Sequence, residues 1–240
     1  IKDIATFKEK VEFTPKLINY IYGSNGCGKT TLTRLINGLI PNYYNGRLSG
    51  DVIIDSHNLS KLSLYEISKF VGSVFQNPRT QFFNVDSTSE LAFACENQGL
   101  PENKIVSSIF ETAAMFNINH LLGKNIFNLS GGEKQKIACA SVSVSSPSII
   151  VLDEPSSNLD THSTDDLRKM ISIWKSQGKT IVTAEHRLYY LSGLFDRVIY
   201  MENGRIQKEY TSTDIEKLSM SEQIEMGLRP FELKLFPLSV

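Results

Sequence analysis

The sequence predicts an α/β fold: a parallel-sheet core with a small antiparallel β subdomain at its N-terminus and an inserted block of helices. Strand-length apolar segments alternate with helical segments along the chain, an order typical of a parallel sheet. From about residue 88 to 146 the pattern is helical, with a break at Pro101. Two carboxylates, Asp153 and Glu154, end the next apolar segment, which places them at the ligand-binding edge of such a sheet.

The individual elements follow from local patterns. Segment Lys2–Phe13 reads as two short strands around a charged turn and predicts the antiparallel subdomain. A helix should run from Thr30 through Leu39, because Pro41 then stops it. Asn203-Gly204 between two strand-like segments predicts a terminal hairpin. The other expected strands are 17–22, 48–55, 70–75, 148–152 and 180–184, and the other expected helices are 134–143 and 165–177.

Composition excludes several classes of protein. The 240 residues carry a net charge of −1, whereas a generic DNA or RNA binder is usually more basic, so no nucleic-acid partner is expected. No apolar run approaches the roughly 20 residues that span a bilayer, and no secretory leader is expected. Cys27, Cys95 and Cys139 lie far apart, which argues against a zinc site or a disulfide framework and favours the cytoplasm.

The strongest motif is Gly23-Ser24-Asn25-Gly26-Cys27-Gly28-Lys29-Thr30, which follows a predicted strand and precedes a helix. G-x-x-x-x-G-K-T in that context predicts a phosphate-binding loop, since its glycines let backbone N–H groups face phosphate oxygens. Lys29 supplies charge for the β and γ phosphates, and Thr30 offers its hydroxyl to Mg²⁺. Thr31 completes the predicted nucleotide contacts. A glycine-rich turn that binds nothing is the disfavoured alternative.

Polar side chains at three predicted strand ends are candidates for catalysis. Asp153 can hold Mg²⁺ through water, and Glu154 can polarise an attacking water. Gln76, also a candidate metal ligand, and His186 could reach the γ-phosphate. A solvated acidic turn is the alternative for the carboxylates, and a structural or exposed role is the alternative for Gln76 and His186. The phosphate loop upstream and the order of the motifs favour catalysis.

The order of these motifs resembles that of the ATP-binding cassette (ABC) ATPases. Segment Leu129-Ser130-Gly131-Gly132-Glu133-Lys134-Gln135 is similar to the signature loop of that family, and Ser157-Asn158-Leu159-Asp160 is similar to its D-loop. Gln76 matches the Q-loop glutamine and His186 the switch histidine. The resemblance implies a P-loop nucleoside triphosphatase core, with the signature loop on the inserted helical subdomain, and hydrolysis of ATP with Mg²⁺.

The resemblance also implies a pair of cassettes arranged head to tail. ATP on the phosphate loop of one cassette is then closed over by Ser130, Gly131 and Gly132 of the other. These residues begin a helix, whose N-terminal amides favour a phosphate. Glu133 and Asp160 belong to the same predicted set of nucleotide contacts.

A narrower resemblance points to the ATPases of energy-coupling-factor importers for vitamins and for cobalt or nickel. Segments Val74–Pro78, Gln81–Val85 and Ala184–Leu188 are similar to that group. The resemblance implies a second ABC ATPase, identical or not, a transmembrane coupling protein and a small substrate-capture membrane protein. The chain would be peripheral at the cytoplasmic face of the cell membrane. Phe82 and Phe83 are candidate contacts with the coupling protein, and core packing is an equal alternative.

Two other functions are weighed: the ATPase of a conventional ABC transporter, and a non-transport cassette acting in translation or DNA repair. Translation-type members usually carry two cassettes, and repair-type members carry long coiled coils before the signature. Here 101 positions separate Lys29 from Ser130 (130 − 29), enough for a compact helical subdomain. A module that binds nucleotide without hydrolysing it is disfavoured by Glu154 and His186.

The adenine end of the pocket has one candidate. Phe7 lies 16 positions before Gly23 (23 − 7), closer than the family's stacking aromatic usually does. We expect either that Phe7 stacks on adenine from a shortened hairpin or that the stacking residue is absent, with Phe13 in the core. Cys27 is interpreted as a small residue tolerated in the loop, where an alkylating reagent should reach it unless ATP protects it.

We expect one ABC ATPase domain over residues 1–210, with the helical subdomain at about 88–146 inserted in it. Residues 211–240 are expected to form a C-terminal tail with weak helical character. The tail is too short for a regulatory domain.

Overall fold

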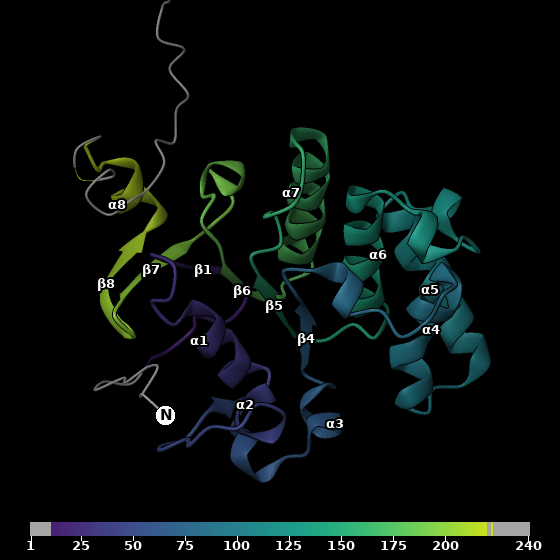
Figure 1. Ribbon diagram of the computed structural model, residues 1–240, viewed down its shortest axis with the longest axis horizontal. Coiled ribbons are helices and arrows are strands. Elements are labelled where there is room, and N and C mark those ends of the chain that lie inside the picture. Colours follow the sequence, from purple (N-terminus) through teal and green to yellow (C-terminus); the bar gives the residue numbers. More distant parts are fainter. Residues whose placement is uncertain (1–10, 220–221, 223–240) are drawn as a thin grey trace, which may run out of the picture.

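The protein is described from a computed structural model, in which residues 11–219 and 222 are described. Its core is a six-stranded sheet of order β4-β5-β6-β1-β7-β8 (Figure 1). All neighbours are parallel except β7 and β8, which form the predicted antiparallel hairpin. The strands are β1 Ile18–Gly23, β4 Val71–Val74, β5 Ile149–Asp153, β6 Thr180–Ala184, β7 Arg197–Glu202 and β8 Arg205–Thr211.

Helices cover both faces of this sheet. Alternate residues of β1 belong to two apolar clusters, Ile18 and Tyr20 to one and Ile21 to the other, as the two-residue period of a strand requires. α1 contributes Leu32 to the cluster of Ile21, whereas α4 to α7 pack in the other cluster. The helices are α1 Lys29–Ile36, α2 Leu39–Asn42, α3 Leu64–Ile67, α4 Ser87–Asn97, α5 Glu102–Met115, α6 Gly131–Val144, α7 Thr161–Ser176 and α8 Ser212–Glu216.

The expected fold class is confirmed: a parallel-sheet α/β core with a small antiparallel sheet and inserted helices. α4, α5 and α6 contact one another and lie to one side of the sheet in Figure 1. They occupy the region expected for the inserted subdomain, although its bounds and the division into domain and tail stay a prediction. Among the described residues, no helix is long and apolar enough to span a membrane.

Several predicted boundaries are wrong. The helix after the phosphate loop ends at Ile36 rather than Leu39, because Gly38 takes a left-handed conformation (φ 72°). The expected strand 48–55 is reduced to β2 Ile53–Ile54, which pairs antiparallel with β3 His57–Asn58. A hairpin was expected at 2–13. Residues 11–13, at its end, form no strand, and the rest of the expected hairpin, including Phe7, lies outside the described residues. The antiparallel sheet is thus β2–β3.

Candidate functional site

The phosphate loop joins β1 to α1, as expected. Gly28 precedes the helix with φ 106°, a left-handed conformation that favours glycine. No side chain caps α1, so the N–H groups of its first turn stay available to an anion. Gly23 has a second requirement, because a Cβ there would clash with the backbone oxygen of Met201 in β7. Gly26 also has positive φ, and Ser24 and Asn25 are exposed at the loop's outer rim.

Lys29 lies inside this loop. Its side chain is buried, and Nζ donates to the backbone oxygens of Gly23 at 2.8 Å and Ser24 at 3.0 Å. A buried ammonium needs hydrogen-bond acceptors, and here the loop provides them. The charge is therefore held where phosphate oxygens of a nucleotide would compete for the same donors.

Cys27 has a different environment from the one expected. Its side chain is 3% exposed and belongs to the apolar cluster of Ile21 and Leu32. The side chain thus anchors the loop in the core, and only the backbone of this residue remains for a nucleotide. Access of an alkylating reagent to this thiol is not supported by the structure.

Thr30 and Asp153 form a candidate metal site between α1 and the end of β5. Thr30 Oγ1 donates to Asp153 Oδ1 at 3.1 Å. Burial raises the pKa of Asp153, and the Thr30 hydrogen bond offsets part of this shift. A hydroxyl and a carboxylate are hard oxygen donors that suit Mg²⁺, which usually completes its shell with water and substrate phosphates. Among the residues described, no group of three or more His, Cys, Asp or Glu side chains is placed to hold a metal ion.

Glu154 follows β5, and side chains that follow the two neighbouring strands approach it. Gln76, after β4, donates from Nε2 to Glu154 Oε2 at 3.0 Å, and His186, after β6, places Nε2 3.2 Å from Glu154 Oε1. The His186 contact is a close approach without hydrogen-bond alignment, since its buried Nε2 has no aligned partner. Glu154 has φ 45° and its N–H donates to Ala184 O at 2.7 Å, so the backbone turns at the residue after Asp153. The two carboxylates thereby face different partners.

The signature-like loop starts α6. Ser130 Oγ accepts from the Glu133 N–H at 3.3 Å, and Glu133 Oε2 accepts from the Ser130 N–H at 2.8 Å. This capping box lowers the pKa of Glu133. Ser130 and Gly131 are exposed, and Gly132 packs against Ser163 of α7.

The structure does not bring the signature-like loop to the chain's own phosphate loop. α6 packs on the face of the sheet opposite α1, and no hydrogen bond between the described residues joins the two loops. Asp160, in the D-loop-like segment, accepts from the Ser163 N–H at 2.7 Å and caps α7. Thr31 is partly exposed in the first turn of α1. Phe82 packs against the core, whereas Phe83 is 76% exposed and stacks on Phe93.

Two polar side chains of this region were missed from the sequence. Lys134 is buried and donates from Nζ to Phe127 O at 3.1 Å and to Leu129 O, which holds the backbone before Ser130 in place. Glu185 is 1% exposed and bonds to the turn that follows Glu154. A usable signal was present for Glu185, because an acid directly after a buried strand has to find donors inside the protein.

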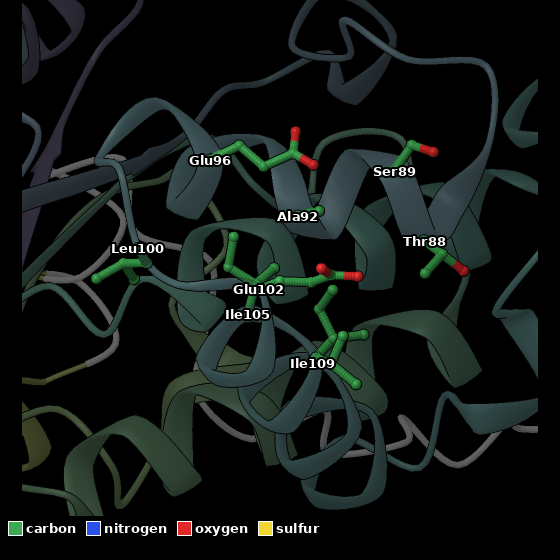
Figure 2. Close-up of a pocket in the computed structure, with 9 residues that line it drawn as sticks. Thr88, Ser89, Ala92, Glu96, Leu100, Glu102, Ile105 and Ile109 are labelled. Carbon is green, nitrogen blue, oxygen red and sulfur yellow. The ribbon is translucent and has the colours of Figure 1, made fainter.

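A hollow lies between α4 and α5, away from the phosphate loop. It has a volume of about 500 Å³, and Figure 2 shows Thr88, Glu96 and Ile105 among the side chains that line it. None of the predicted site residues in the described part of the chain lines it. The hollow is thus separate from the nucleotide-binding elements.

A phosphate loop between a buried strand and a helix, whose Thr30 bonds to the acidic end of β5 in the same parallel sheet, defines a P-loop nucleoside triphosphatase. Residues 9–157 match the model of the family described as ABC transporter. The chain belongs to the ABC transporter family and is one of its ATPase domains. The resemblance to ABC ATPases seen in the sequence is thereby confirmed.

Curated relatives agree with this assignment. An ABC transporter ATP-binding protein of Treponema denticola is 54% identical over 184 residues, which are 77% of this chain and 38% of that protein. Another, of Pyrococcus abyssi, is 36% identical over 210 residues, 87% of this chain and 73% of that protein. The chain spans only 38% and 43% of the length of two Treponema denticola relatives.

Two solved structures have a similar fold. CbiO1 from Clostridium perfringens, described as part of the ABC transporter complex cbiONQ, has a TM-score of 0.77 and 27% identity, with 90% of this chain and 84% of that chain covered. The ATP-binding cassette MJ0796, described as a dimer in a post-hydrolysis state with ADP and Pi, has a TM-score of 0.72 and 21% identity, with 84% of this chain and 88% of that chain covered. The second likeness concerns the fold alone.

Proposed function

We propose that this ATPase powers a membrane importer of the energy-coupling-factor type, for vitamins or for cobalt or nickel, from the cytoplasmic face of the membrane. The observation that carries the proposal is the likeness to CbiO1, which is part of an ABC transporter complex. The segments around Gln76 and His186, which resemble the same group of importers, support it independently of the fold.

ATP binds at the loop Gly23–Thr30 in this proposal. Lys29 exchanges its bonds to Gly23 O and Ser24 O for phosphate oxygens. Thr30, Gln76 and Asp153 would hold Mg²⁺, which supplies positive charge against the phosphates. Phe7 remains the proposed adenine contact, outside the described residues.

Hydrolysis requires a positioned water at the γ-phosphate, and Glu154 is its general base. Gln76 orients Glu154 through its hydrogen bond to Oε2, and His186 approaches Oε1 from the other neighbour of β5. His186 then also faces the γ-phosphate side of the site. Such positioning is the main contribution a protein makes to phosphoryl transfer.

A second cassette completes the site. Ser130 and Gly131 are exposed at the start of α6, away from the chain's own phosphate loop, so their free face suits the nucleotide of a partner cassette. Glu133 holds Ser130 in its capping box, and Asp160 borders the same partner-facing side. The partner cassette is an identical or a related chain.

A surface groove of this chain suits a transmembrane partner. An apolar groove of about 330 Å³ lies next to the Q-loop and is lined by residues that include Leu39, Tyr65, Phe75, Phe83 and Phe93. Phe83 is strongly exposed, and its ring stacks on that of Phe93 with the two ring centroids 4.8 Å apart. We assign this groove to the transmembrane coupling protein.

Affinity purification of the full-length protein from its native membranes tests the proposal. We expect one coupling protein and one small substrate-capture membrane protein to co-purify. A polytopic permease without a capture protein would favour a conventional ABC transporter instead. Recovery of a ribosome or DNA-repair complex without membrane proteins would reject a transport role.

A matched pair of variants tests the groove. Phe83→Asp should release the coupling protein while ATP binding is kept, because the charge would enter an apolar contact. Phe110→Asp, at an exposed position of α5 outside the groove, is the control and should retain the coupling protein. Equal retention by both variants would exclude this groove.

A further inference from the structure

A buried carboxylate lies between the two catalytic segments. Glu185 follows β6 directly, precedes His186 and is 1% exposed. Its backbone N–H donates to Ile21 O at 3.2 Å, which fixes the residue to β1. The phosphate loop begins two residues later on that strand, at Gly23.

The two oxygens of this carboxylate accept hydrogen bonds from two different segments. Oε2 accepts from the Ser156 N–H at 3.1 Å and from Ser156 Oγ at 2.6 Å. Oε1 accepts from the N–H groups of His186 at 2.8 Å and Arg187 at 3.3 Å. One side chain thus ties the turn after Glu154 to the segment that carries His186.

Arg187 strengthens the same connection. Its Nη1 donates to the backbone oxygens of Ser156 at 3.2 Å and Leu159 at 3.4 Å. These oxygens belong to the turn that continues into Asp160, the cap of α7. The turn therefore has Glu154 at one end and the D-loop-like segment at the other, with Glu185 bonded near its middle.

Two buried tyrosines, Tyr20 and Tyr190, are influenced by the charge of this carboxylate. Burial is the main cause that raises the pKa of Tyr20 well above its usual value, and the charge of Glu185 is the second. The same two causes raise the pKa of Tyr190. Both hydroxyls stay protonated at neutral pH and are buried without a hydrogen-bond partner in the part of the chain described. The carboxylate is thus shielded from solvent, and its hydrogen bonds connect Ser156 to the backbone of His186.

We propose that Glu185 is a positioning residue for ATP hydrolysis, which couples the placement of Glu154 and the D-loop-like turn to the placement of His186. The inference rests on the proposed function, because it concerns the water-activating group and the histidine beside it. Glu185 touches no reacting atom and acts through Ser156 and the His186 backbone. Contacts made by the turn with a partner cassette are transmitted to His186 by this carboxylate.

Replacement of the carboxylate by its amide tests the role. Glu185→Gln keeps the size of the side chain but loses the charge and one acceptor. In the full-length protein we expect kcat for ATP to fall by on the order of tenfold to a hundredfold, as for other small displacements of catalytic groups. KM and the binding constant for ATP should stay within about twofold, because the phosphate loop is unchanged.

Two further variants separate positioning from general damage. Ser156→Ala, which removes only the hydroxyl bonded to Oε2, should lower kcat as well. The double variant should be no slower than the slower single variant, since both act on one connection. Glu111→Gln, at an exposed position of α5, is the matched control and should retain parental activity and Tm.

The outcomes distinguish this inference from the proposed function. Parental turnover by Glu185→Gln, or a rate loss matched by an equal loss of ATP affinity, would overturn the positioning role while ATP hydrolysis stands. If Glu185→Gln does not fold, Ser156→Ala decides alone, and a parental kcat for it would overturn the role. A parent protein that binds ATP without hydrolysing it would overturn the proposed function and this inference with it.

Discussion

Gln76 Nε2 and Glu154 Oε2 lie 3.0 Å apart, although 78 positions separate the two residues in the chain. β4 and β5 are parallel neighbours, with Val74 opposite Leu152, so their carboxyl ends deliver both side chains to one edge of the sheet. β6 brings His186 to the same place from the other side of β5. This convergence is the structural basis for our proposal that Glu154 is the general base.

Replacement of Lys29 by Ala should weaken ATP binding, because the phosphates lose their buried positive charge. Hydrogen bonds to charged groups contribute about 1.5–3 kcal/mol, which corresponds to a roughly tenfold to hundredfold higher Kd. Titration calorimetry with ATP measures the change. Lys61→Ala, at an exposed position far from the loop in sequence, is the control, and equal Kd values for both variants would contradict the assignment.

Asp153→Asn should stabilise the protein in the absence of Mg²⁺. Burial raises the pKa of Asp153 above its ordinary value of 3.8, so the ionised form is less favourable in the folded state than in the unfolded state. The wild-type protein therefore loses stability relative to Asp153→Asn as the pH rises from 3.8 through the folded pKa.

Thermal unfolding at several pH values checks this. The variant should have the higher Tm at neutral pH without Mg²⁺, and the difference should shrink as the pH is lowered towards 3.8. Added Mg²⁺ and ATP should raise the Tm of the wild type more than that of the variant. A lower Tm for Asp153→Asn in metal-free neutral buffer would argue against a carboxylate held ready for a cation.

The two adjacent glycines of the signature-like loop should respond differently to a methyl group. A Cβ at Gly132 would clash with Ser163 Oγ and lie 2.9 Å from Ser163 Cβ, whereas a Cβ at Gly131 meets nothing within 4 Å. Gly132→Ala should therefore cost about 1–3 kcal/mol, with roughly 2–4 °C in Tm for each kcal/mol in a chain of this size. Calorimetry checks the stability, and Ser163→Gly should restore part of it.

Gly131→Ala is the complementary test. It should change the free energy of unfolding by no more than a surface substitution does, about ±0.5 kcal/mol, because no residue that the structure describes contacts the new methyl group. ATP turnover should nevertheless fall if this surface faces a partner's nucleotide. Unchanged turnover at high protein concentration would remove Gly131 from the proposed interface.

Cys27, Cys95 and Cys139 should react with a maleimide only after unfolding, since all three thiols are buried. Burial also raises the pKa of Cys139 to about 12, which keeps that thiol protonated at neutral pH. Peptide mass spectrometry after brief labelling of the native protein measures the modification at each position. Rapid native labelling of Cys27 would show that the phosphate loop opens beyond the described arrangement.

Local patterns were sufficient to predict the strands that carry the site. β1, β5 and β6 are mostly apolar and almost wholly buried, which is typical of strands covered on both faces. The segment 48–55 was harder, because Gly50 and the positive φ angles at Asp55 and Ser56 shorten the strand to two residues. Two successive non-glycine residues at positive φ leave a weak signal in the sequence.

The site could be predicted where a residue type and its spacing carry the chemistry, as for Lys29 and Thr30. The environment of a side chain could not be predicted from residue type and spacing. Cys27 was expected to be a small residue tolerated in the loop and reachable by an alkylating reagent, yet its side chain packs in the core. Glu185 was passed over because its role depends on Ser156, 29 positions away in the chain, and the strand order alone brings the two together.

ATP turnover by Glu154→Gln in the full-length protein tests the central claim most directly. The amide can still accept the Gln76 hydrogen bond but cannot take a proton from water, so kcat should fall by roughly 10²–10⁴-fold while the Kd for ATP is kept. An ATP-bound closed dimer should accumulate and be visible by size-exclusion chromatography with light scattering, whereas Glu111→Gln should behave as the parent. Normal hydrolysis by Glu154→Gln would contradict the account.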